Sequence, residues 1–206
     1  MKLVVFSSHS NFHSEPRHIV RMFDHGLESL HLRKPEFSSK NLIEYIQLIP
    51  SKYHDRIILH SHHKLAKKFN LKGLHFSKSH RSKNYNTKLK YWIFRLRFGN
   101  ILTTRSCHKI HKLEENPNRY DYVFLSPMFE SISKKAHSGL FSERHLTKAL
   151  ATKKRSVYAL GGIDESKFKA LNDLGFEGVA LLGAIWDTDK DPVAAYLSAM
   201  EAIKNL

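Results

Sequence analysis

Short apolar runs alternate with segments of helical spacing along almost the whole chain. The apolar runs predict strands at 2–7, 29–33, 57–60, 73–77, 101–106, 121–126, 156–162 and 178–185. Apolar residues three or four positions apart predict helices at 16–26, 39–49, 62–69, 109–115, 142–151, 164–174 and 190–204. Residues 80–99 fit a helix, although 92–98 also alternate like a strand, and we favour the helix.

Local signals support several of the predicted helix ends. Pro16 suits the first turn of a helix, where a missing N–H costs nothing, and Gly26 suits the position after its end. Ser38 or Ser39 can cap the second helix, and Asp164 can cap the helix at 164–174. On the last helix, we expect Val193, Tyr196, Leu197 and Met200 to share the buried face.

Eight strands that alternate with eight helical segments predict a parallel sheet, because parallel strands need crossover connections. Eight such units are the number found in a (β/α)8 barrel, and a chain of 206 residues is long enough for a compact one. We therefore expect an α/β fold in which residues 1–206 form a single TIM barrel. A doubly wound open sheet is the alternative, but no GxGxxG motif follows the first strand.

Composition restricts the class of protein and the cellular location that we expect. Hydrophobic residues make up 41% and charged residues 26%, which is typical of globular proteins. No apolar run is long enough to span a membrane, and the N-terminus lacks the apolar length of a signal peptide. Cys107 is the single cysteine, so an intrachain disulfide is excluded. We expect a cytoplasmic protein with no membrane partner, while a homo-oligomer remains open.

The chain is strongly basic, with a formal net charge of +15 and 15 histidines. This charge favours anionic partners, either nucleic acids or small phosphorylated molecules. The basic residues are scattered, and the two densest stretches match no nucleic-acid-binding signature. Nucleic acid is therefore an unlikely partner, and small phosphorylated ligands are favoured.

In a barrel, residues at the carboxyl ends of all strands meet at one face. That rule gathers a dispersed set of candidate side chains and glycines: His31, Arg33, His60, His75, Lys78, His80, Ser106, His108, Ser131, Ser133, Lys134, Gly161, Gly162 and Gly183. The glycines after the last two strands suit a phosphate site, because their backbone can approach the anion closely. They can equally serve tight turns.

A zinc site and a cysteine nucleophile are both disfavoured. His60, His62, His63, His75 and His80 are close in sequence, but alternate strand positions point to opposite sides, so we expect few of them to converge. By the same alternation, Cys107 points away from its neighbours Ser106 and His108. We assign no metal ligand.

Taken together, these motifs resemble the thiamine phosphate synthase/TenI superfamily over about residues 2–186. The resemblance rests on a series of segments in the family's order: HLRK, IILHSHHKLA, KGLHFS, TTRSCH, DYVFLSPMFESISKK, YALGGI and GVALLGAI. It implies a (β/α)8 barrel and a role in thiamine biosynthesis. In the synthase, a thiazole phosphate displaces pyrophosphate from an aminopyrimidine pyrophosphate with the help of magnesium.

The resemblance carries over some site residues and breaks at others. The motif Gln-Leu-Arg-Glu-Lys falls on residues 31–35, which keeps Arg33 but places His31 at the Gln and Pro35 at the Lys. The pyrophosphate loop falls on residues 131–134, which keeps the two serines and Lys134. The phosphate-binding glycine pair falls on Gly161 and Gly162, and the serine usual after strand eight falls on Gly183.

The magnesium ligands are the main departure. The family's Asn-Asp pair falls on His60 and Ser61, and its second metal-binding Asp falls on His80. Magnesium prefers oxygen ligands, mainly carboxylates. We therefore assign no cofactor, and we expect magnesium to be used only if the protein is a synthase. In the TenI branch, the thiazole tautomerase uses a histidine that falls on His108, which can shuttle a proton near neutral pH.

We accordingly favour a TenI-like isomerase that moves a proton on the ring of a thiazole phosphate. His108, Arg33 and Lys134 are the predicted catalytic residues. The predicted substrate- and phosphate-binding residues are His31, His60, Ser106, Ser131, Ser133, Gly161, Gly162 and Gly183. A synthase that also binds the pyrimidine pyrophosphate, with altered metal handling, is the alternative. A non-catalytic barrel that regulates or binds nucleic acid is the third possibility.

Overall fold

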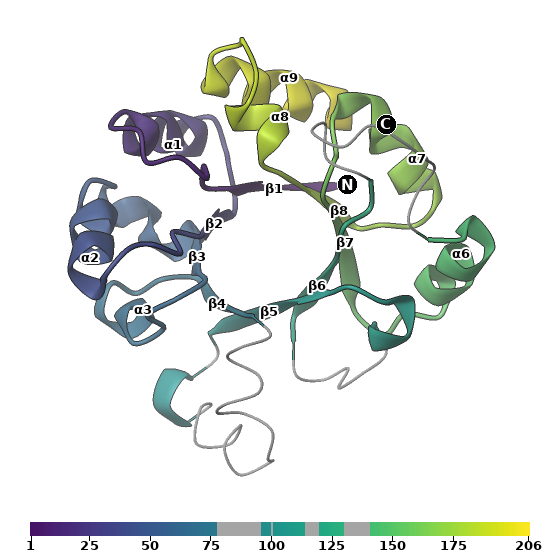
Figure 1. Ribbon diagram of the computed structural model, residues 1–206, viewed down its shortest axis with the longest axis horizontal. Coiled ribbons are helices and arrows are strands. Elements are labelled where there is room, and N and C mark those ends of the chain that lie inside the picture. The colour runs from purple at the N-terminus through teal and green to yellow at the C-terminus, as the bar shows by residue number, and fades with distance from the viewer. Residues whose placement is uncertain (78–95, 100, 114–119, 130–140) are drawn as a thin grey trace.

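The computed structural model describes residues 1–77, 96–99, 101–113, 120–129 and 141–206. Eight parallel strands close into a barrel in sequence order, and the last strand pairs with the first (Figure 1). The strands are β1 (Lys2–Phe6), β2 (Leu30–Leu32), β3 (Ile57–Leu59), β4 (Gly73–Phe76), β5 (Leu102–Cys107), β6 (Tyr122–Leu125), β7 (Ser156–Leu160) and β8 (Gly178–Leu181). The predicted single TIM barrel is therefore confirmed.

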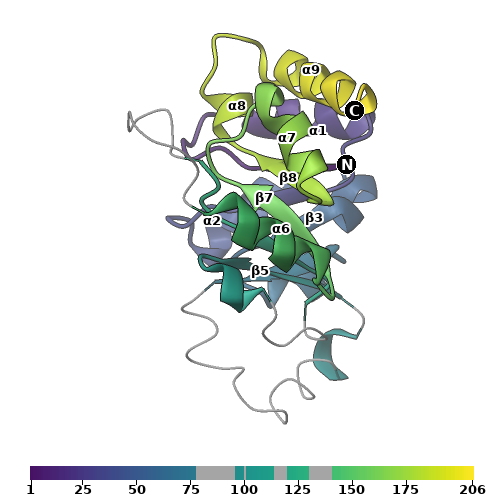
Figure 2. The same ribbon diagram turned by 90° about the vertical axis from the view of Figure 1, so that its right-hand side faces the viewer.

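The helices surround the barrel on its outer side (Figures 1 and 2). They are α1 (Glu15–Asp24), α2 (Ser39–Gln47), α3 (Leu65–Lys68), α6 (Glu143–Ala151), α7 (Phe168–Asp173), α8 (Gly183–Trp186) and α9 (Pro192–Lys204). The short 3-10 helices among the described residues are η1 (Ser51–Arg56), η2 (Ile110–Lys112) and η3 (Glu165–Lys167). No helix in the described residues is both long and apolar enough to cross a membrane.

Each strand buries both of its faces, so two separate cores form. Alternate residues of β1 illustrate the division: Leu3 and Val5 pack toward the helices, whereas Val4 and Phe6 fill the inside of the barrel. The other residues of the inner core are Ile58, Tyr122, Phe124, Tyr158 and Ala180. This double burial explains why the strands appear in the sequence as nearly continuous apolar runs.

The predicted helix signals are found at several ends. Pro16 lies in the first turn of α1, and Gly26 follows the helix with φ +91°. The Ser38 side chain accepts a hydrogen bond from the Asn41 N–H and caps α2. Asp164 accepts from the Ser166 N–H and begins the segment formed by η3 and α7.

Three predictions about the elements need correction, and a fourth is only partly covered by the described residues. The predicted strand at 178–185 ends at Leu181, and Gly183–Trp186 forms the short helix α8. The predicted helix at 109–115 is only the 3-10 turn η2 in its described part. Leu197 is 41% exposed, so it does not share the buried face of α9. Of the helix predicted at 80–99, only Leu96–Phe98 are seen as helical, and 80–95 and 100 lie outside the described residues.

Candidate functional site

A cavity of about 830 Å³ opens at the carboxyl end of the barrel. Its walls come from the ends of five neighbouring strands, β1, β2, β6, β7 and β8, and from the segments that follow them. Of the sequence-predicted site residues, Arg33, Gly161, Gly162 and Gly183 line this one cavity. The fold thus brings together residues that are 150 positions apart.

The turn after β7 offers backbone N–H groups to the cavity. Gly161 and Gly162 adopt φ values of +100° and +64°, which side chains rarely tolerate. Their carbonyls are bonded elsewhere, since Phe129 N–H donates to Gly161 O at 3.1 Å and Lys167 Nζ donates to Gly162 O at 2.9 Å. The N–H groups of both glycines donate to no described residue. N–H groups without a described partner, in residues that line the cavity, suit an anion.

Lys167 holds this turn in place through a second contact. Its ammonium also forms an ion pair with Asp164, which accepts from Ser166 as well. Burial alone would raise the pKa of Asp164, but hydrogen bonds from Lys167 and Ser166 hold it below its ordinary value. The carboxylate therefore stays ionised and engaged, although it lies in the wall of the cavity.

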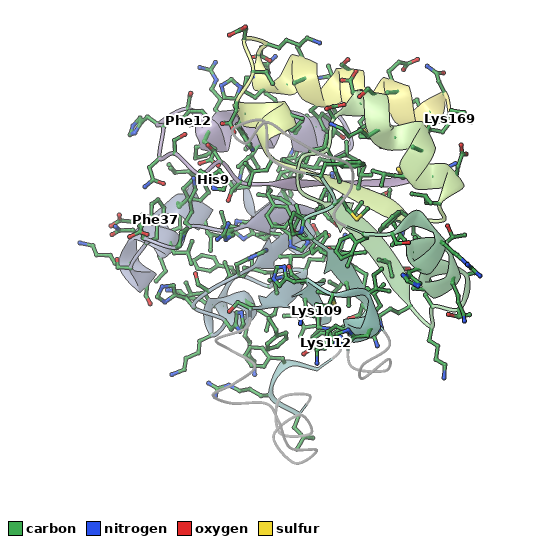
Figure 3. The ribbon with its side chains drawn as sticks, turned by 45° about the vertical axis from the view of Figure 1, so that its right-hand side comes forward. His9, Phe12, Phe37, Lys109, Lys112 and Lys169 are labelled. Atoms are coloured by element: carbon green, nitrogen blue, oxygen red, sulfur yellow. The ribbon has the colours of Figure 1, made fainter. Side chains whose placement is uncertain are left out.

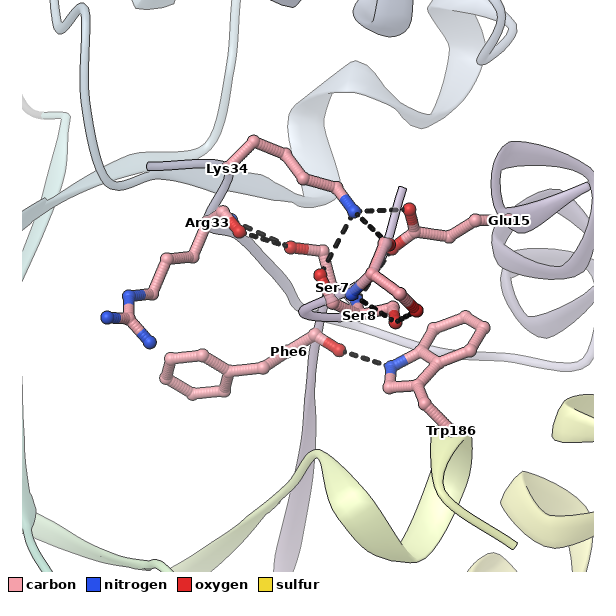
Figure 4. Close-up of polar contacts among 8 residues, drawn as sticks. Phe6, Ser7, Ser8, Glu15, Arg33, Lys34 and Trp186 are labelled. Carbon is pink, nitrogen blue, oxygen red and sulfur yellow. Dashed lines mark hydrogen bonds and ion pairs between the residues drawn. The ribbon is translucent and has the colours of Figure 1, made fainter. Parts of the chain in front are cut away.

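Gly183, the first residue of α8, forms the wall next to the turn. A side chain at this position would approach Asp187, whose Oδ2 is 3.2 Å from the place of a Cβ. The same short helix is tied to β1, because Trp186 Nε1 donates to Phe6 O at 2.7 Å (Figure 4). This bond fixes α8 against the barrel.

Arg33 and Lys190 are cations that line the cavity, and Arg33 is the one among the predicted site residues. Its main chain is held by Ser7, whose hydroxyl donates to Arg33 O at 3.0 Å and accepts from Arg33 N–H at 2.9 Å. The guanidinium extends away from this network (Figure 4) and makes no hydrogen bond or ion pair with a described residue. A guanidinium with unused donors suits a carboxylate or a phosphate.

Ser7→Ala is expected to loosen Arg33, because both main-chain groups of Arg33 lose their partner. We expect a loss of roughly 1–3 kcal/mol in the free energy of unfolding, since the bonds are partly buried. Affinity for an anionic ligand should fall by about tenfold or less. Urea unfolding and ligand titration measure the two effects, and Ser10→Ala, which removes only a contact with Ser8, is the control. Unchanged stability in Ser7→Ala would contradict the role given to Ser7.

The residue after Arg33, Lys34, forms a buried ion pair with Glu15. Lys34 Nζ is 2.5 Å from Glu15 Oε2, and both side chains are only 1% exposed. Lys34 also donates to the carbonyls of Ser8 and Ser10 at 3.0 and 3.1 Å, so all three ammonium protons have acceptors. Glu15 Oε1 accepts from Ser8 N–H at 2.6 Å. The pair therefore joins α1, the end of β2 and the segment after β1 (Figure 4).

His108 follows β5 at the carboxyl end of the barrel and has a defined tautomer. Its Nδ1 is 2.7 Å from Ser126 O, and a carbonyl can only accept, so Nδ1 carries the proton. The lone pair of neutral His108 is therefore on Nε2. His108 itself is exposed and does not line the cavity, whereas Ser126 does. Figure 3 shows the nearby Lys109 and Lys112 on the segment that follows β5. Cys107 is buried in the outer core, as the alternation predicted.

His31, His60 and His75 meet inside the barrel, on its β2–β4 side. His31 Nδ1 is 2.9 Å from His60 Nε2, and the rings of His60 and His75 stack with centroids 4.1 Å apart. Three ring nitrogens, one from each histidine, lie within 4.8 Å of one another. The expectation that few histidines converge is thus only partly right, because His62 and His63 bond elsewhere while His31 joins the group.

The environment disfavours the charged forms of His31 and His60. Burial lowers the pKa of His31 well below its ordinary value, and the neighbouring charge of His75 adds to the effect. The pKa of His60 is lowered by burial and by His75 and His31. Burial raises the pKa of Tyr122, whose hydroxyl is 2.5 Å from His31 Nε2. His31 and His60 are therefore uncharged nitrogen donors near pH 7.

His31 and His60 lie in a different part of the barrel from the residues that line the cavity. Neither lines the cavity of about 830 Å³, although both were predicted to bind substrate. Ser106 also lies in this interior group, with Oγ 3.4 Å from His75 Nε2. Ser131, Ser133, Lys134, Lys78 and His80 lie outside the described residues, so their predicted roles stay predictions.

Sequence reasoning missed the residues that position the site. Ser7, Glu15 and Lys167 carry no motif, and their roles depend on neighbours distant in sequence. The inward direction of His31 and His75 could have been inferred from the residues that they pair with on the neighbouring strands, which face the inside of the barrel. Register cannot be read without the strand pairing.

Comparison with known proteins places this barrel in a family. The sequence model of thiamine monophosphate synthase matches residues 3–185. The chain belongs to this family. Membership of the thiamine monophosphate synthase family makes it an enzyme of thiamine biosynthesis.

Individual relatives agree with the family. The thiamine-phosphate synthase of Clostridium botulinum (strain 657 / Type Ba4) is 24% identical over 175 residues, which is 82% of each chain. The solved structure of thiamine phosphate pyrophosphorylase from Bacteroides thetaiotaomicron is 30% identical, with a TM-score of 0.77, and covers 100% of this chain and 96% of that chain. The thiamine phosphate pyrophosphorylase from Pyrococcus furiosus has a TM-score of 0.76 at 15% identity, covers 99% of this chain and 96% of that chain, and shows the fold alone.

The family's magnesium does not fit the ligands on the β3–β5 side. Residues 56–113, which supply these strands and the segments between them, contain no Asp or Glu, whereas Glu114, Glu115 and Asp121 follow later in the segment after β5. By the resemblance described above, the family's metal-binding carboxylates would fall on Ser61 and His80. Magnesium needs hard oxygen ligands, and this part of the chain offers nitrogen and positive charge instead. We therefore derive no catalytic step through magnesium.

Proposed function

We propose that this member of the family isomerises a thiazole phosphate by moving a proton on the thiazole ring. The observation that carries the proposal is His108, whose Nδ1–H donates to Ser126 O at 2.7 Å and leaves a lone pair on Nε2. An imidazole whose Nδ1–H is held by a carbonyl, at the carboxyl end of the barrel, is suited to general acid–base chemistry. The lack of any acid in residues 56–113 favours a reaction that needs no magnesium.

The cavity supports a substrate with two acidic groups. The N–H groups of Gly161 and Gly162 would hold the phosphate, with Gly183 beside them. Arg33 would hold a carboxylate on the ring, because its guanidinium has unused donors and lines the same cavity. The ring would then lie between the two anchors, within the region that Ser126 borders.

His108→Ala is expected to lower kcat for tautomerisation by roughly 10²–10⁴-fold, the usual contribution of general acid–base catalysis. The affinity for the substrate should change little, since the phosphate and carboxylate anchors remain. The proton shift can be followed by NMR on the phosphorylated carboxythiazole. His111→Ala, which removes another exposed histidine three positions away, is the matched control. Unchanged turnover in His108→Ala would remove His108 from the mechanism.

Synthase chemistry is the second candidate. It is favoured by the names of the relatives and by the serines and lysine at residues 131–134, which resemble the family's pyrophosphate loop. The diagnostic is product formation from the thiazole phosphate and the aminopyrimidine pyrophosphate, with and without magnesium. Product at a rate above that of tautomerisation would replace the isomerase proposal, and no product under either condition would remove the synthase.

A further inference from the structure

We propose that His31, His60 and His75 form a binding site for a divalent metal ion such as zinc inside the barrel. The three histidines come from adjacent strand ends, β2, β3 and β4, and one ring nitrogen of each lies within 4.8 Å of the others. This arrangement is independent of the isomerase proposal, because none of the three lines the cavity at β7 and β8.

The remaining nitrogens of two of the rings already have orienting partners. Tyr122 Oη is 2.5 Å from His31 Nε2, and Thr104 Oγ1 is 2.9 Å from His75 Nδ1. Histidines that bind metal usually hold their second N–H in such a contact, which fixes the ring and the tautomer. The ligand atoms would be His31 Nδ1, His60 Nε2 and His75 Nε2, and the last of these would exchange its 3.4 Å contact with Ser106 Oγ for the ion.

Aromatic residues shield the site. The Phe6 ring stacks on His31 with centroids 4.9 Å apart, and Phe124 meets the same imidazole edge-on at 4.9 Å. His31 and His75 are buried, whereas His60 is only partly buried and lies toward the open end of the barrel. An ion held by the three rings would therefore have its fourth position on the side of His60. Three protein ligands with one open position are typical of catalytic zinc sites.

Binding requires a local adjustment. The rings of His60 and His75 are nearly parallel, at an interplanar angle of 12°. A lone pair lies in the plane of its ring, so two parallel rings cannot both point at one ion. The His60 ring must turn and carry its proton on Nδ1, which frees Nε2 from its contact with His31 Nδ1.

The chemistry of the site selects the ion. Neutral imidazoles suit zinc, copper, nickel and iron, whereas magnesium and calcium prefer oxygen. No carboxylate can compete within residues 56–113, which provide two of the three ligands. The charge of the bound ion would be balanced by an anion at the open position.

The test measures metal content in the full chain without turnover. Wild-type protein is loaded with zinc, passed through gel filtration and assayed by mass spectrometry, and cobalt is added separately to read its visible absorption. We expect one tightly held ion per chain and the strong absorption of four-coordinate cobalt. His60→Gln and His75→Gln should lose both signals, with folding checked by circular dichroism in the presence of chelator.

Two further variants make the result decisive. Tyr122→Phe keeps all three ligands and should weaken zinc affinity by roughly 10- to 100-fold, because it removes an outer hydrogen bond. His145→Gln removes an exposed histidine of α6 and should keep full zinc content, which controls for surface binding in a chain with 15 histidines. Equal zinc content in the wild type and in folded His60→Gln and His75→Gln would overturn the proposal.

Discussion

Gly161→Ala is expected to abolish high-affinity binding of the thiazole phosphate. The backbone at Gly161 has φ +100°, and an added Cβ would lie 3.1 Å from Pro127 Cα and Cβ. Strain of this kind costs about 1–3 kcal/mol. The turn must shift to relieve it, and the N–H groups of Gly161 and Gly162 shift with it. Each lost hydrogen bond to a charged group costs about 1.5–3 kcal/mol, so affinity should fall at least tenfold.

Gly26→Ala provides the matched control. Gly26 has a similar φ of +91°, but no atom lies within 4 Å of the place of its Cβ. It precedes β2, so it lies at the end of the barrel opposite the cavity. We expect Gly26→Ala to lose stability without losing affinity. Calorimetric titration with the thiazole phosphate and thermal unfolding separate the two effects. Wild-type affinity in folded Gly161→Ala would show that the phosphate binds elsewhere.

Glu15→Ala is expected to cause the largest loss of stability. The Lys34 ammonium would remain 1% exposed beside Tyr45 and Phe37, without its counter-charge. Breaking a buried ion pair from one side costs about 3–5 kcal/mol, because the remaining charge is unpaired. Urea unfolding monitored by fluorescence measures this loss directly.

Two comparisons test the explanation for Glu15. The Lys40–Glu44 pair is 4.0 Å long with side chains 86% and 61% exposed, so Glu44→Ala should change stability by about 0.5 kcal/mol or less. Adding Lys34→Met to Glu15→Ala should recover part of the lost stability, because it removes the stranded charge. If the double variant is less stable than Glu15→Ala alone, the unpaired ammonium is not the cause.

The barrel could be predicted because its strands are buried on both faces. Double burial makes each strand an apolar run, and the alternation with helices then allows few topologies. The error at 178–185 has the same origin, because a buried strand and the buried turn of helix that follows it are equally apolar. Periodicity could not show that the chain bends at Leu182 and begins α8 at Gly183.

Part of the candidate site could likewise be predicted from the sequence, and part of it could not. Arg33, Gly161, Gly162 and Gly183 could be placed in advance, since residues that follow barrel strands meet at one face. The convergence of His31 with His60 and His75 could not, because it depends on the register between strands and on which way each ring turns. The same holds for Ser7 and Lys167, whose partners are 26 and 5 positions away and are main-chain atoms.

The sequence by itself determined the barrel, the family and the absence of acids from residues 56–113. Those properties follow from composition and order along the chain. Only the tertiary structure decided that Arg33 shares a cavity with Gly161, that Lys34 is buried against Glu15, and that three histidines face one another. Side-chain chemistry depends on distances of a few ångströms, and closure of the barrel sets those distances between residues far apart in sequence.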